Sequence, residues 1–475
     1  GQHWLDPNSA DAITFETNFN LDLNGDGSIG NAYNTVHTVG SIAFQKASGS
    51  GRYAVSVNGG SPTPITWNGT QIYEGIYSDW VTLAAAEISG VNTVLWKNIS
   101  ENVLHTWSLD SEWRRVSGQH WLDPNSADAI TFETNFNLDL NGDGTVGNPT
   151  SLSNPTLEPR YSGQWHLTSS STGGANVEAA WSLKNNSGKN IYGTGIHINI
   201  IDDGIEKSHA DLSTNYIAAS SYDYVGGDHD PTPPSNNNHG TACAGVAAGY
   251  GHNGVGITGA APNANISGQR LLGASTATNE AAALIHTMNA VDIYSNSWGP
   301  YDDGTLQPAP PEVLAALEKG TTSGRNGRGV IYAWAAGNGR KNNDNSNYDG
   351  YSNSRYVIAV AAVTDGGTYS SYSEPGANLL VSSPSKGGTN AITTSSTNNG
   401  YIDNFGGTSS ATPLVSGVIA LMLEANPNLT WRDVQHVLLN SSDVVDSRNS
   451  GWFTNGAGHE YSHDYGFGRI NAESA

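Results

Sequence analysis

Short apolar runs alternate with helical segments from about residue 158 to the C-terminus, and this alternation restricts the fold more than any other feature of the sequence. It predicts an α/β domain with a mostly parallel sheet and helices on both faces. The carboxyl ends of the strands in such a sheet gather the functional residues. The expected strands are 196–201, 266–272, 293–297, 330–335 and 356–363, and the expected helices are 240–249, 279–291, 311–319, 408–425 and 430–440.

An internal repeat precedes this region. Residues 1–27 recur as residues 118–144, and self-similarity of this kind indicates duplicated modules. Alternating stretches between the copies are typical of short antiparallel strands, and the apolar spacing that includes Ile130, Phe132 and Phe136 indicates a helical tail. We expect four parts: the tail of a repeat module at 1–30, a tryptophan-rich β-rich repeat at 31–147, a linker at 148–157 and the α/β domain at 158–475.

Each copy of the repeat ends in Asp-Leu-Asn-Gly-Asp-Gly, a loop similar to the calcium loop of an EF-hand. Alternate side-chain oxygens and a glycine at the sixth position suit calcium, but Tyr33 and Thr150 stand where a bidentate Glu is usual. A plain Asn/Gly/Asp turn is the alternative interpretation. The candidate ligands are Asp22, Asn24 and Asp26 in the first loop and Asp139, Asn141 and Asp143 in the second.

The charge of the chain restricts its partners. With 20 basic and 43 acidic residues the formal net charge is -23, which argues against nucleic acid or an anionic membrane surface and favours cationic ligands, including metal ions. The single cysteine, Cys243, allows no internal disulfide. No apolar run approaches the length of about 18 residues that spans a bilayer, and the start at Gly1 is consistent with a processed chain or a fragment.

Three motifs follow one another in the order Asp, His, Ser. Asp202 follows an expected strand directly, His239 stands before a small-residue helix, and Ser409 lies in Gly-Thr-Ser-Ser-Ala-Thr-Pro at the start of another helix. Acyl transfer by a serine needs a base for its proton, an acid that orients the imidazole and a donor for the oxyanion. Asn338 in Ala-Gly-Asn-Gly would be that donor. The sequence therefore predicts a serine nucleophile, Ser409, with a general base, His239, an orienting carboxylate, Asp202, and an oxyanion donor.

Residues 158–475 resemble a subtilisin-like serine protease (subtilase) through the motifs Asp202-Asp203-Gly204, His239-Gly240-Thr241, Gly337-Asn338-Gly339 and Gly407-Thr408-Ser409. The motifs around Asp203, Cys243, Ser297 to Gly304 and Asp349 are similar to those of the kexin/furin branch. The resemblance implies a subtilisin-like three-layer fold. Residues 1–148 resemble the tryptophan-rich repeats of large exported cyanobacterial proteins, which implies a secreted or cell-surface bacterial protein.

The kexin/furin resemblance implies cleavage after Arg or Lys. Asp302 would line the wall of the primary pocket and Asp349 its floor, because fixed carboxylates select a cationic side chain. Asp203 would serve the next subsite, where Asn236 replaces a second acid, so a second basic residue should help less than in kexin. Further acidic contacts fall on Pro308 and near Glu280 or Ala281, so a strict multibasic motif is not expected. Ser297, Trp298 and Gly299 would complete the substrate-binding residues.

The same resemblance implies two calcium sites in the α/β domain. Asp302, Asp344 and Glu374 match a site that braces the primary pocket, where a cation relieves the repulsion of the carboxylates. The second match is the high-affinity subtilase site, where Glu158 replaces the usual Asp; its ligands would be Glu158, Asp211, Tyr250, Asn253, Val255 and Ile257. As an alternative, these acids are ordinary surface residues.

The sequence thus predicts a secreted, calcium-dependent serine endopeptidase that acts on proteins or peptides with basic residues. Two alternatives remain open at this point. A broad-specificity subtilisin would keep the catalysis, but Asp302 and Asp349 argue against it. A catalytically silent surface-binding protein would keep the fold, but the presence of Asp202, His239 and Ser409 argues against it.

Overall fold

The computed structural model describes residues 33–48, 50–88, 90–122, 124, 127–140, 146, 154–185 and 187–475. The chain forms two compact units, Gly1–Thr150 and Ser151–Ala475, which are described separately below. The first copy of the repeat at 1–30 and the second calcium-loop sequence from Asn141 to Thr145 lie outside the described residues.

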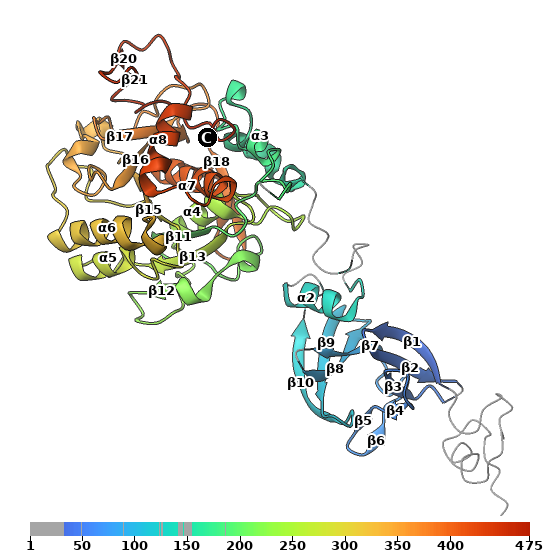
Figure 1. Ribbon diagram of the computed structural model, residues 1–475. Helices are drawn as coiled ribbons and strands as arrows, with labels where there is room; N and C mark the ends of the chain where they lie inside the picture. The colour runs from blue at the N-terminus through green and yellow to red at the C-terminus, as the bar shows by residue number, and fades with distance from the viewer. Residues whose placement is uncertain are drawn as a thin grey trace, which may run out of the picture. The chain divides into compact units, whose positions relative to one another are not determined.

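The described part of the N-terminal unit consists of two four-stranded antiparallel sheets, a short hairpin and one helix (Figure 1). The first sheet has the order β1-β2-β3-β4 and the second has the order β10-β9-β8-β7. The strands are β1 (Tyr33–Val39), β2 (Ile42–Ala47), β3 (Tyr53–Val57), β4 (Thr63–Pro64), β5 (Thr66–Trp67), β6 (Thr70–Gln71), β7 (Trp80–Ile88), β8 (Val91–Asn98), β9 (Val103–Leu109) and β10 (Arg115–Leu122), and the helix is α2 (Ala127–Phe136).

Tryptophans supply much of the core of this unit. Trp96, Trp107 and Trp113 are each at most 5% exposed and share one cluster with residues of both sheets. Helix α2 buries Phe136 completely against residues of the second sheet. The ring of His37, in β1 of the first sheet, forms a hydrogen bond with the Phe136 carbonyl at 2.6 Å. The expected β-rich module with a helical tail is therefore confirmed for the described part of the repeat.

The C-terminal unit is organised around a seven-stranded sheet of order β12-β13-β11-β14-β15-β16-β17, in which every neighbouring pair is parallel. Two short hairpins, β18-β19 and β20-β21, lie outside this sheet. The strands are β11 (His197–Asp202), β12 (Tyr222–Asp223), β13 (Asn265–Arg270), β14 (Ile293–Asn296), β15 (Ile331–Ala335), β16 (Val357–Val363), β17 (Leu379–Pro384), β18 (Ile392–Ser396), β19 (Gly400–Phe405), β20 (Phe453–Thr454) and β21 (Glu460–Tyr461).

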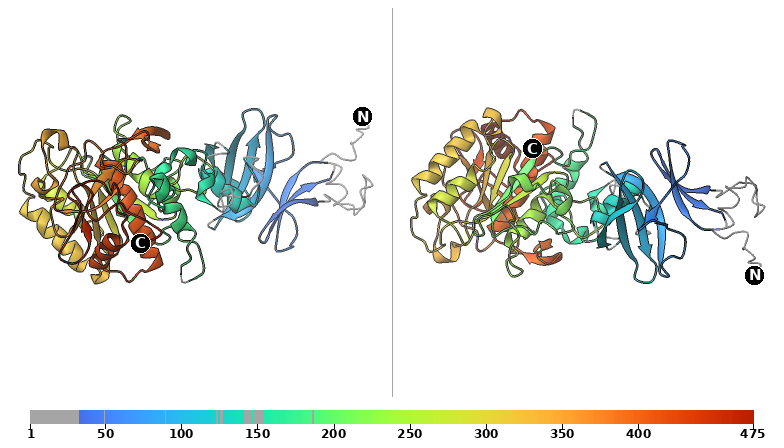
Figure 2. Two further views of the ribbon diagram at one scale, coloured as in Figure 1. Left: turned by 90° about the horizontal axis from the view of Figure 1, so that it is seen from above. Right: turned by 90° about the horizontal axis from the view of Figure 1, so that it is seen from below.

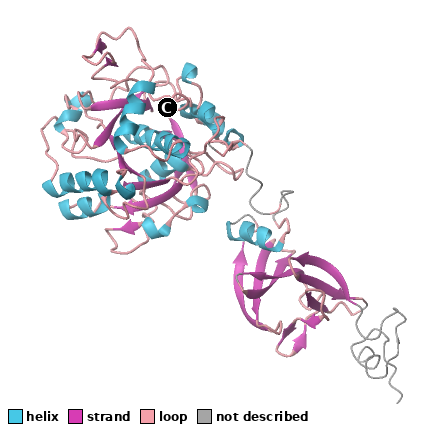
Figure 3. Cartoon of the chain, in the orientation of Figure 1, coloured by secondary structure: helices cyan, strands magenta, loops and turns pink. Residues whose placement is uncertain are grey.

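Helices cover both faces of the sheet, because alternate strand residues point to opposite sides (Figure 3). Ile200 packs in the cluster that contains α4 and α7, whereas Ile201 packs in the cluster that contains α5 and α6. Helices α5 and α6 lie side by side on their face (Figure 2). The helices are α3 (Val177–Trp181), α4 (His239–Ala248), α5 (Ala277–Leu284), α6 (Pro311–Ser323), α7 (Thr408–Ala425) and α8 (Trp431–Ser441).

These elements confirm the expected three-layer α/β fold, with two differences in detail. Helix α5 ends at Leu284 instead of continuing to 291, because Thr287 has a positive φ of 52° and the Tyr332 hydroxyl donates 2.6 Å to the carbonyl of Leu284. Strands β12 and β17 to β21 are additional. Strands β12, β20 and β21 are very short, β17 and β18 contain several Ser or Thr residues, and β19 mixes polar with apolar residues, so they lack the apolar signal that marks the other strands.

Among the described helices, α7 alone is long and apolar enough to cross a membrane by length and composition. However, 83% of it is buried inside the unit, as expected for a core helix. It packs against α4 and across strands β14 to β17. This helix is therefore central to the core.

We expect Gly417→Ala to destabilise the C-terminal unit. A Cβ atom on Gly417 of α7 would lie 2.6 Å from Ala260 Cβ and 2.7 Å from the carbonyl oxygen of Ala247 in α4. Overpacking lowers the free energy of unfolding by about 1–3 kcal/mol. The better helix propensity of Ala raises it by about 1 kcal/mol at most. Chemical unfolding should show a net loss of stability. The control is Gly456→Ala, whose Cβ atom would meet nothing within 4 Å; equal stability of the two variants would contradict the packing argument.

Candidate active site

Ser409 lies in the first turn of α7, immediately after a tight backbone turn. Gly407 precedes the helix with φ 77° and ψ 169°, a conformation that favours glycine. A Cβ atom on Gly407 would also lie 3.3 Å from Asn338 Oδ1. Glycine therefore allows the chain to turn into the helix beside Asn338.

A proline inside α7 frees the backbone carbonyl of Ser409. Pro413 has no N–H group, so it cannot donate the helical hydrogen bond to the carbonyl four residues earlier. Two side chains contact that carbonyl instead: Ser297 Oγ at 3.1 Å and Cys243 Sγ at 3.6 Å. The first turn of α7 is thus attached to the segment after β14 and to α4.

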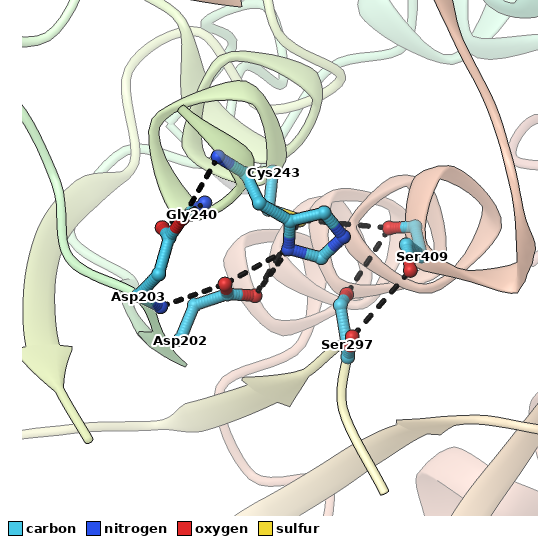
Figure 4. Close-up of polar contacts among 7 residues, drawn as sticks. Asp202, Asp203, Gly240, Cys243, Ser297 and Ser409 are labelled. Carbon is cyan, nitrogen blue, oxygen red and sulfur yellow. Dashed lines mark hydrogen bonds and ion pairs between the residues drawn. The ribbon is translucent and has the colours of Figure 1, made fainter. Parts of the chain in front are cut away.

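Asp202 and His239 meet where β11 ends and α4 begins (Figure 4). His239 Nδ1 lies 2.8 Å from Asp202 Oδ1 and 3.0 Å from Oδ2. Asp202 is completely buried, whereas the His239 side chain is 35% exposed. Gly240 permits this approach, because a Cβ atom there would lie 2.2 Å from the carbonyl oxygen of Gly204.

The Asp202 carboxylate raises the pKa of His239 to about 9, against the opposing effect of burial, and Asp203 adds a smaller attraction. This arrangement stabilises an imidazolium, which is the form that the histidine takes when it has accepted a proton from a serine. The hydrogen bond at Nδ1 leaves Nε2 as the ring nitrogen available for that proton.

The hydroxyl of Ser409 lies among these groups. Its Oγ donates to the carbonyl oxygen of Ser297 at 3.4 Å, a long contact (Figure 4). The catalytic hydrogen bond would run instead from this hydroxyl to His239 Nε2; such bonds are often long or poorly aligned in substrate-free enzymes and tighten when substrate binds. The order Asp202, His239, Ser409 in the sequence thus becomes one cluster in space.

Asn338 is oriented by the turn before α7. Its Oδ1 accepts from the Thr408 backbone N–H at 2.9 Å and from the Thr408 hydroxyl at 3.2 Å. In the described part of the chain, no group accepts a hydrogen bond from its Nδ2. The amide N–H groups therefore remain to donate to an oxyanion beside Ser409, together with the backbone N–H of Ser409, which has no acceptor among the described residues.

Ser409 and Asn338 open into a cavity of about 250 Å³ that contains several carboxylates. Asp349 and Asp302 line this cavity, as do Ser297, Trp298 and Gly299, so the predicted pocket residues are brought together. Asp349 Oδ1 accepts from the Tyr351 backbone N–H at 2.7 Å. Burial raises the pKa of Asp349 to about 6. A Cβ atom on Gly299 would lie 3.1 Å from Asp349 Oδ2, so the glycine keeps this carboxylate accessible.

The residues predicted for the next subsite lie outside this cavity. Asp203 accepts hydrogen bonds from the backbone N–H groups of His239 at 3.2 Å and Gly240 at 2.7 Å, so it caps the start of α4. Burial raises the pKa of Asp203 as well. Asn236 is exposed, and neither residue lines the cavity. The structure thus places Asp203 under the histidine and leaves Asn236 on the surface.

The carboxylates of Asp302, Asp344 and Glu374 form one cluster, with ligand atoms within 4.8 Å of one another. No ion pair among the described residues involves them. Burial, with the neighbouring acids, raises the pKa of Glu374 to about 8 and also raises that of Asp302. Three converging acids without a basic partner fit a hard cation such as calcium.

Glu158 and Asp211 form a second buried acidic pair, at 3% and 0% exposure. Burial raises the pKa of Glu158 to about 7. Its Oε1 accepts from the backbone N–H groups of Asn253 and Gly254 at 3.1 Å each, but its buried Oε2 has no partner among the described residues. An orphaned buried oxygen of this kind fits a cation.

The loop with Tyr250, Val255 and Ile257 wraps around Asp211, since the Tyr250 N–H donates to the Asp211 carbonyl at 2.7 Å and the Ile257 N–H to Asp211 Oδ2 at 3.0 Å. Asn253 presents its Nδ2 to Asp211 Oδ1 at 2.9 Å. A cation here would require the Asn253 amide to turn its oxygen inward. The loop therefore surrounds the acidic pair as expected, with one side chain in a different orientation.

Of the predicted EF-hand-like ligands, Asp139 lies in the described residues just after α2, and Asp22, Asn24, Asp26, Asn141 and Asp143 lie outside them. The structure does add contacts that the motifs did not predict. Glu280 is 8% exposed and accepts a hydrogen bond from the Tyr351 hydroxyl at 2.9 Å, which distinguishes it from Ala281. The second unpredicted contact is the hydrogen bond from the Ser297 hydroxyl to the Ser409 carbonyl, which Pro413 leaves without its helical donor. Its only signal in the sequence is a proline four residues after the serine.

Comparison with known proteins agrees with this geometry. Residues 193–468 match the subtilase family, and residues 45–147 match the tryptophan-rich Synechocystis species C-terminal domain. The chain is similar to furin-1 of Xenopus laevis, with 41% identity over 66% of this chain and 40% of that protein, and to human furin, with 40% identity over the same shares. It spans about 40% of the length of these relatives.

A serine protease of Aeromonas sobria has a similar fold, with a TM-score of 0.59 and 26% identity over 70% of this chain and 68% of that chain. The family match extends over more than half of the sequence and includes the cluster around Ser409. The chain therefore belongs to the subtilase family of serine endopeptidases, and within it to the kexin/furin branch.

Proposed function

We propose that the protein is a secreted, calcium-dependent serine endopeptidase that cleaves protein or peptide substrates after Arg or Lys. One observation carries the proposal: Ser409 and two carboxylates, Asp302 and Asp349, line the same cavity. Similarity to furin supports the basic specificity, and the similarity of the N-terminal unit to a tryptophan-rich family supports an exterior location.

In the proposed reaction the basic side chain of the substrate enters the cavity and positions the next peptide bond beside Ser409. Ser409 Oγ attacks the carbonyl carbon while His239 Nε2 accepts its proton, and Asp202 stabilises the imidazolium. Asn338 donates to the oxyanion. His239 then donates the proton to the leaving amine. In the second half of the reaction a water molecule attacks the acyl carbon while His239 accepts its proton, and His239 then returns this proton to Ser409 Oγ as the acid product leaves.

The resident cation is proposed to be calcium, held by the cluster of Asp302, Asp344 and Glu374 and by the site of Glu158 and Asp211. It would supply positive charge to buried carboxylates that otherwise repel one another. The first cluster also touches the reaction site, because Asp302 Oδ2 accepts from the Asn338 backbone N–H at 3.0 Å. Bracing of Asp302 therefore also braces the oxyanion donor.

The pH dependence of activity should follow His239, which must be neutral to accept the proton. Because its pKa is raised, kcat/KM for a short Arg peptide should rise with pH well above the ordinary histidine range. Asp203→Asn removes one of the charges that raise this pKa, so the rising limb should move to lower pH. A pH profile of each protein measures the shift; a profile that stays at the same pH in the variant would contradict the assignment.

Asp349→Asn should reduce kcat/KM for Arg peptides by about 30-fold or more, because a buried charge pair that loses one partner costs about 2–5 kcal/mol. Cleavage after Phe should change little. The matched control is Asp303→Asn, an exposed carboxylate next to Asp302 that does not line the cavity. If both variants lost Arg cleavage equally, the proposed floor of the pocket would be wrong.

Removal of calcium by a chelator should lower both the midpoint of thermal unfolding and the rate of Arg-peptide cleavage, and added calcium should restore both. Terbium luminescence gives a binding readout that does not depend on activity. Glu374→Gln should weaken terbium binding, whereas Glu312→Gln on α6 should not. No change in unfolding temperature upon chelation would contradict both calcium sites.

A further inference from the structure

Three exposed apolar side chains belong to the two segments that line one side of the cavity. Tyr301 is 86% exposed, Leu306 is 70% exposed and Tyr348 is 40% exposed, and the first two are the most exposed large apolar side chains of the described C-terminal unit. Tyr301 and Tyr348 line the cavity itself, and Leu306 lies between its lining residues Thr305 and Gln307. We call Tyr301, Leu306 and Tyr348 the apolar rim.

The backbone under the apolar rim is fixed by hydrogen bonds. The Gln307 N–H donates to the Tyr348 carbonyl at 2.8 Å, and the Gly350 N–H donates to the Gln307 carbonyl at 2.8 Å. Gln307 Nε2 also donates to the Tyr301 carbonyl at 2.7 Å. The two segments are therefore tied together beside Asp349, and the exposure of the rim is a property of an ordered surface.

Exposed apolar side chains that gather at a binding site mark contacts with a partner. The rim is continuous with the cavity, so a peptide whose basic side chain enters the cavity must pass within a few residues of it. The neighbouring carboxylate of Asp303 already accepts hydrogen bonds from Thr305 and Gln307 through its Oδ1. Pro308 follows Gln307 at a position where the family resemblance suggested an acid. The apolar rim therefore favours an apolar side chain of the substrate over a further basic side chain.

We propose that the apolar rim binds an aromatic or long aliphatic side chain of the substrate, a few residues from the basic residue in the cavity. This inference rests on the proposed function. It adds a second requirement to the substrate: one basic side chain together with one large apolar side chain, in place of a run of basic residues.

The test measures binding and cleavage separately. Peptides with a single Arg carry either Phe or Ser at each position in turn on both sides of it, and their affinities for a Ser409→Ala protein are measured by fluorescence anisotropy. We expect Phe at one position to bind about 10-fold more tightly than Ser. In the same background, Tyr301→Ser with Leu306→Ser should abolish this advantage. The matched control is Leu314→Ser, which changes a 41% exposed leucine on α6.

The inference is overturned if Phe gives no advantage at any position, if the advantage persists in the double variant, or if Leu314→Ser removes it as well. A peptide that contacts the N-terminal unit or a second copy of the chain would give the second result. Cleavage of a short Arg peptide by the unsubstituted protein tests the proposed function on its own, so the two failures are distinguishable.

Discussion

The close approach of helices α4 and α7 is the constraint on which the site depends. Each helix begins with a residue of the reaction site, so their packing sets the distance between histidine and serine. The approach needs glycine at Gly417, because a Cβ atom there would lie 2.7 Å from the carbonyl oxygen of Ala247 in α4. Gly240 has a different role: it lets the start of α4 approach Asp202 and the carbonyl of Gly204. The sheet supplies the third group, since β11 delivers Asp202 directly under His239.

Much of this arrangement could be predicted from the sequence, because parallel α/β folds leave a strong pattern. The long apolar runs predicted β11 and β13 to β16, and helix α7 has the predicted bounds of Thr408 and Ala425. The motifs also named several of the residues that line the cavity, including Asp302 and Asp349, but not Tyr301 or Tyr348. The short and serine-rich strands could not be predicted, since their pairing depends on neighbours that are distant in the chain.

Side-chain orientation was the least predictable property. Asp203 stands in a motif that suggests contact with substrate, and this motif did not predict that its carboxylate also accepts two backbone N–H groups at the start of α4. Asn253 stands among predicted calcium ligands and presents its Nδ2 to Asp211. In both cases the sequence gives the residue and the loop, whereas local competition for hydrogen-bond donors decides where the polar atoms point.

The proline in α7 couples the position of the nucleophile to the wall of the substrate cavity. Since Pro413 leaves the Ser409 carbonyl without its helical donor, the residue takes its position from Ser297 and Cys243. Ser297 also lines the cavity. Ser297 therefore affects both which side chain the cavity accepts and where the nucleophile lies. A redesign of this wall for another side chain would also have to replace the contact that positions Ser409.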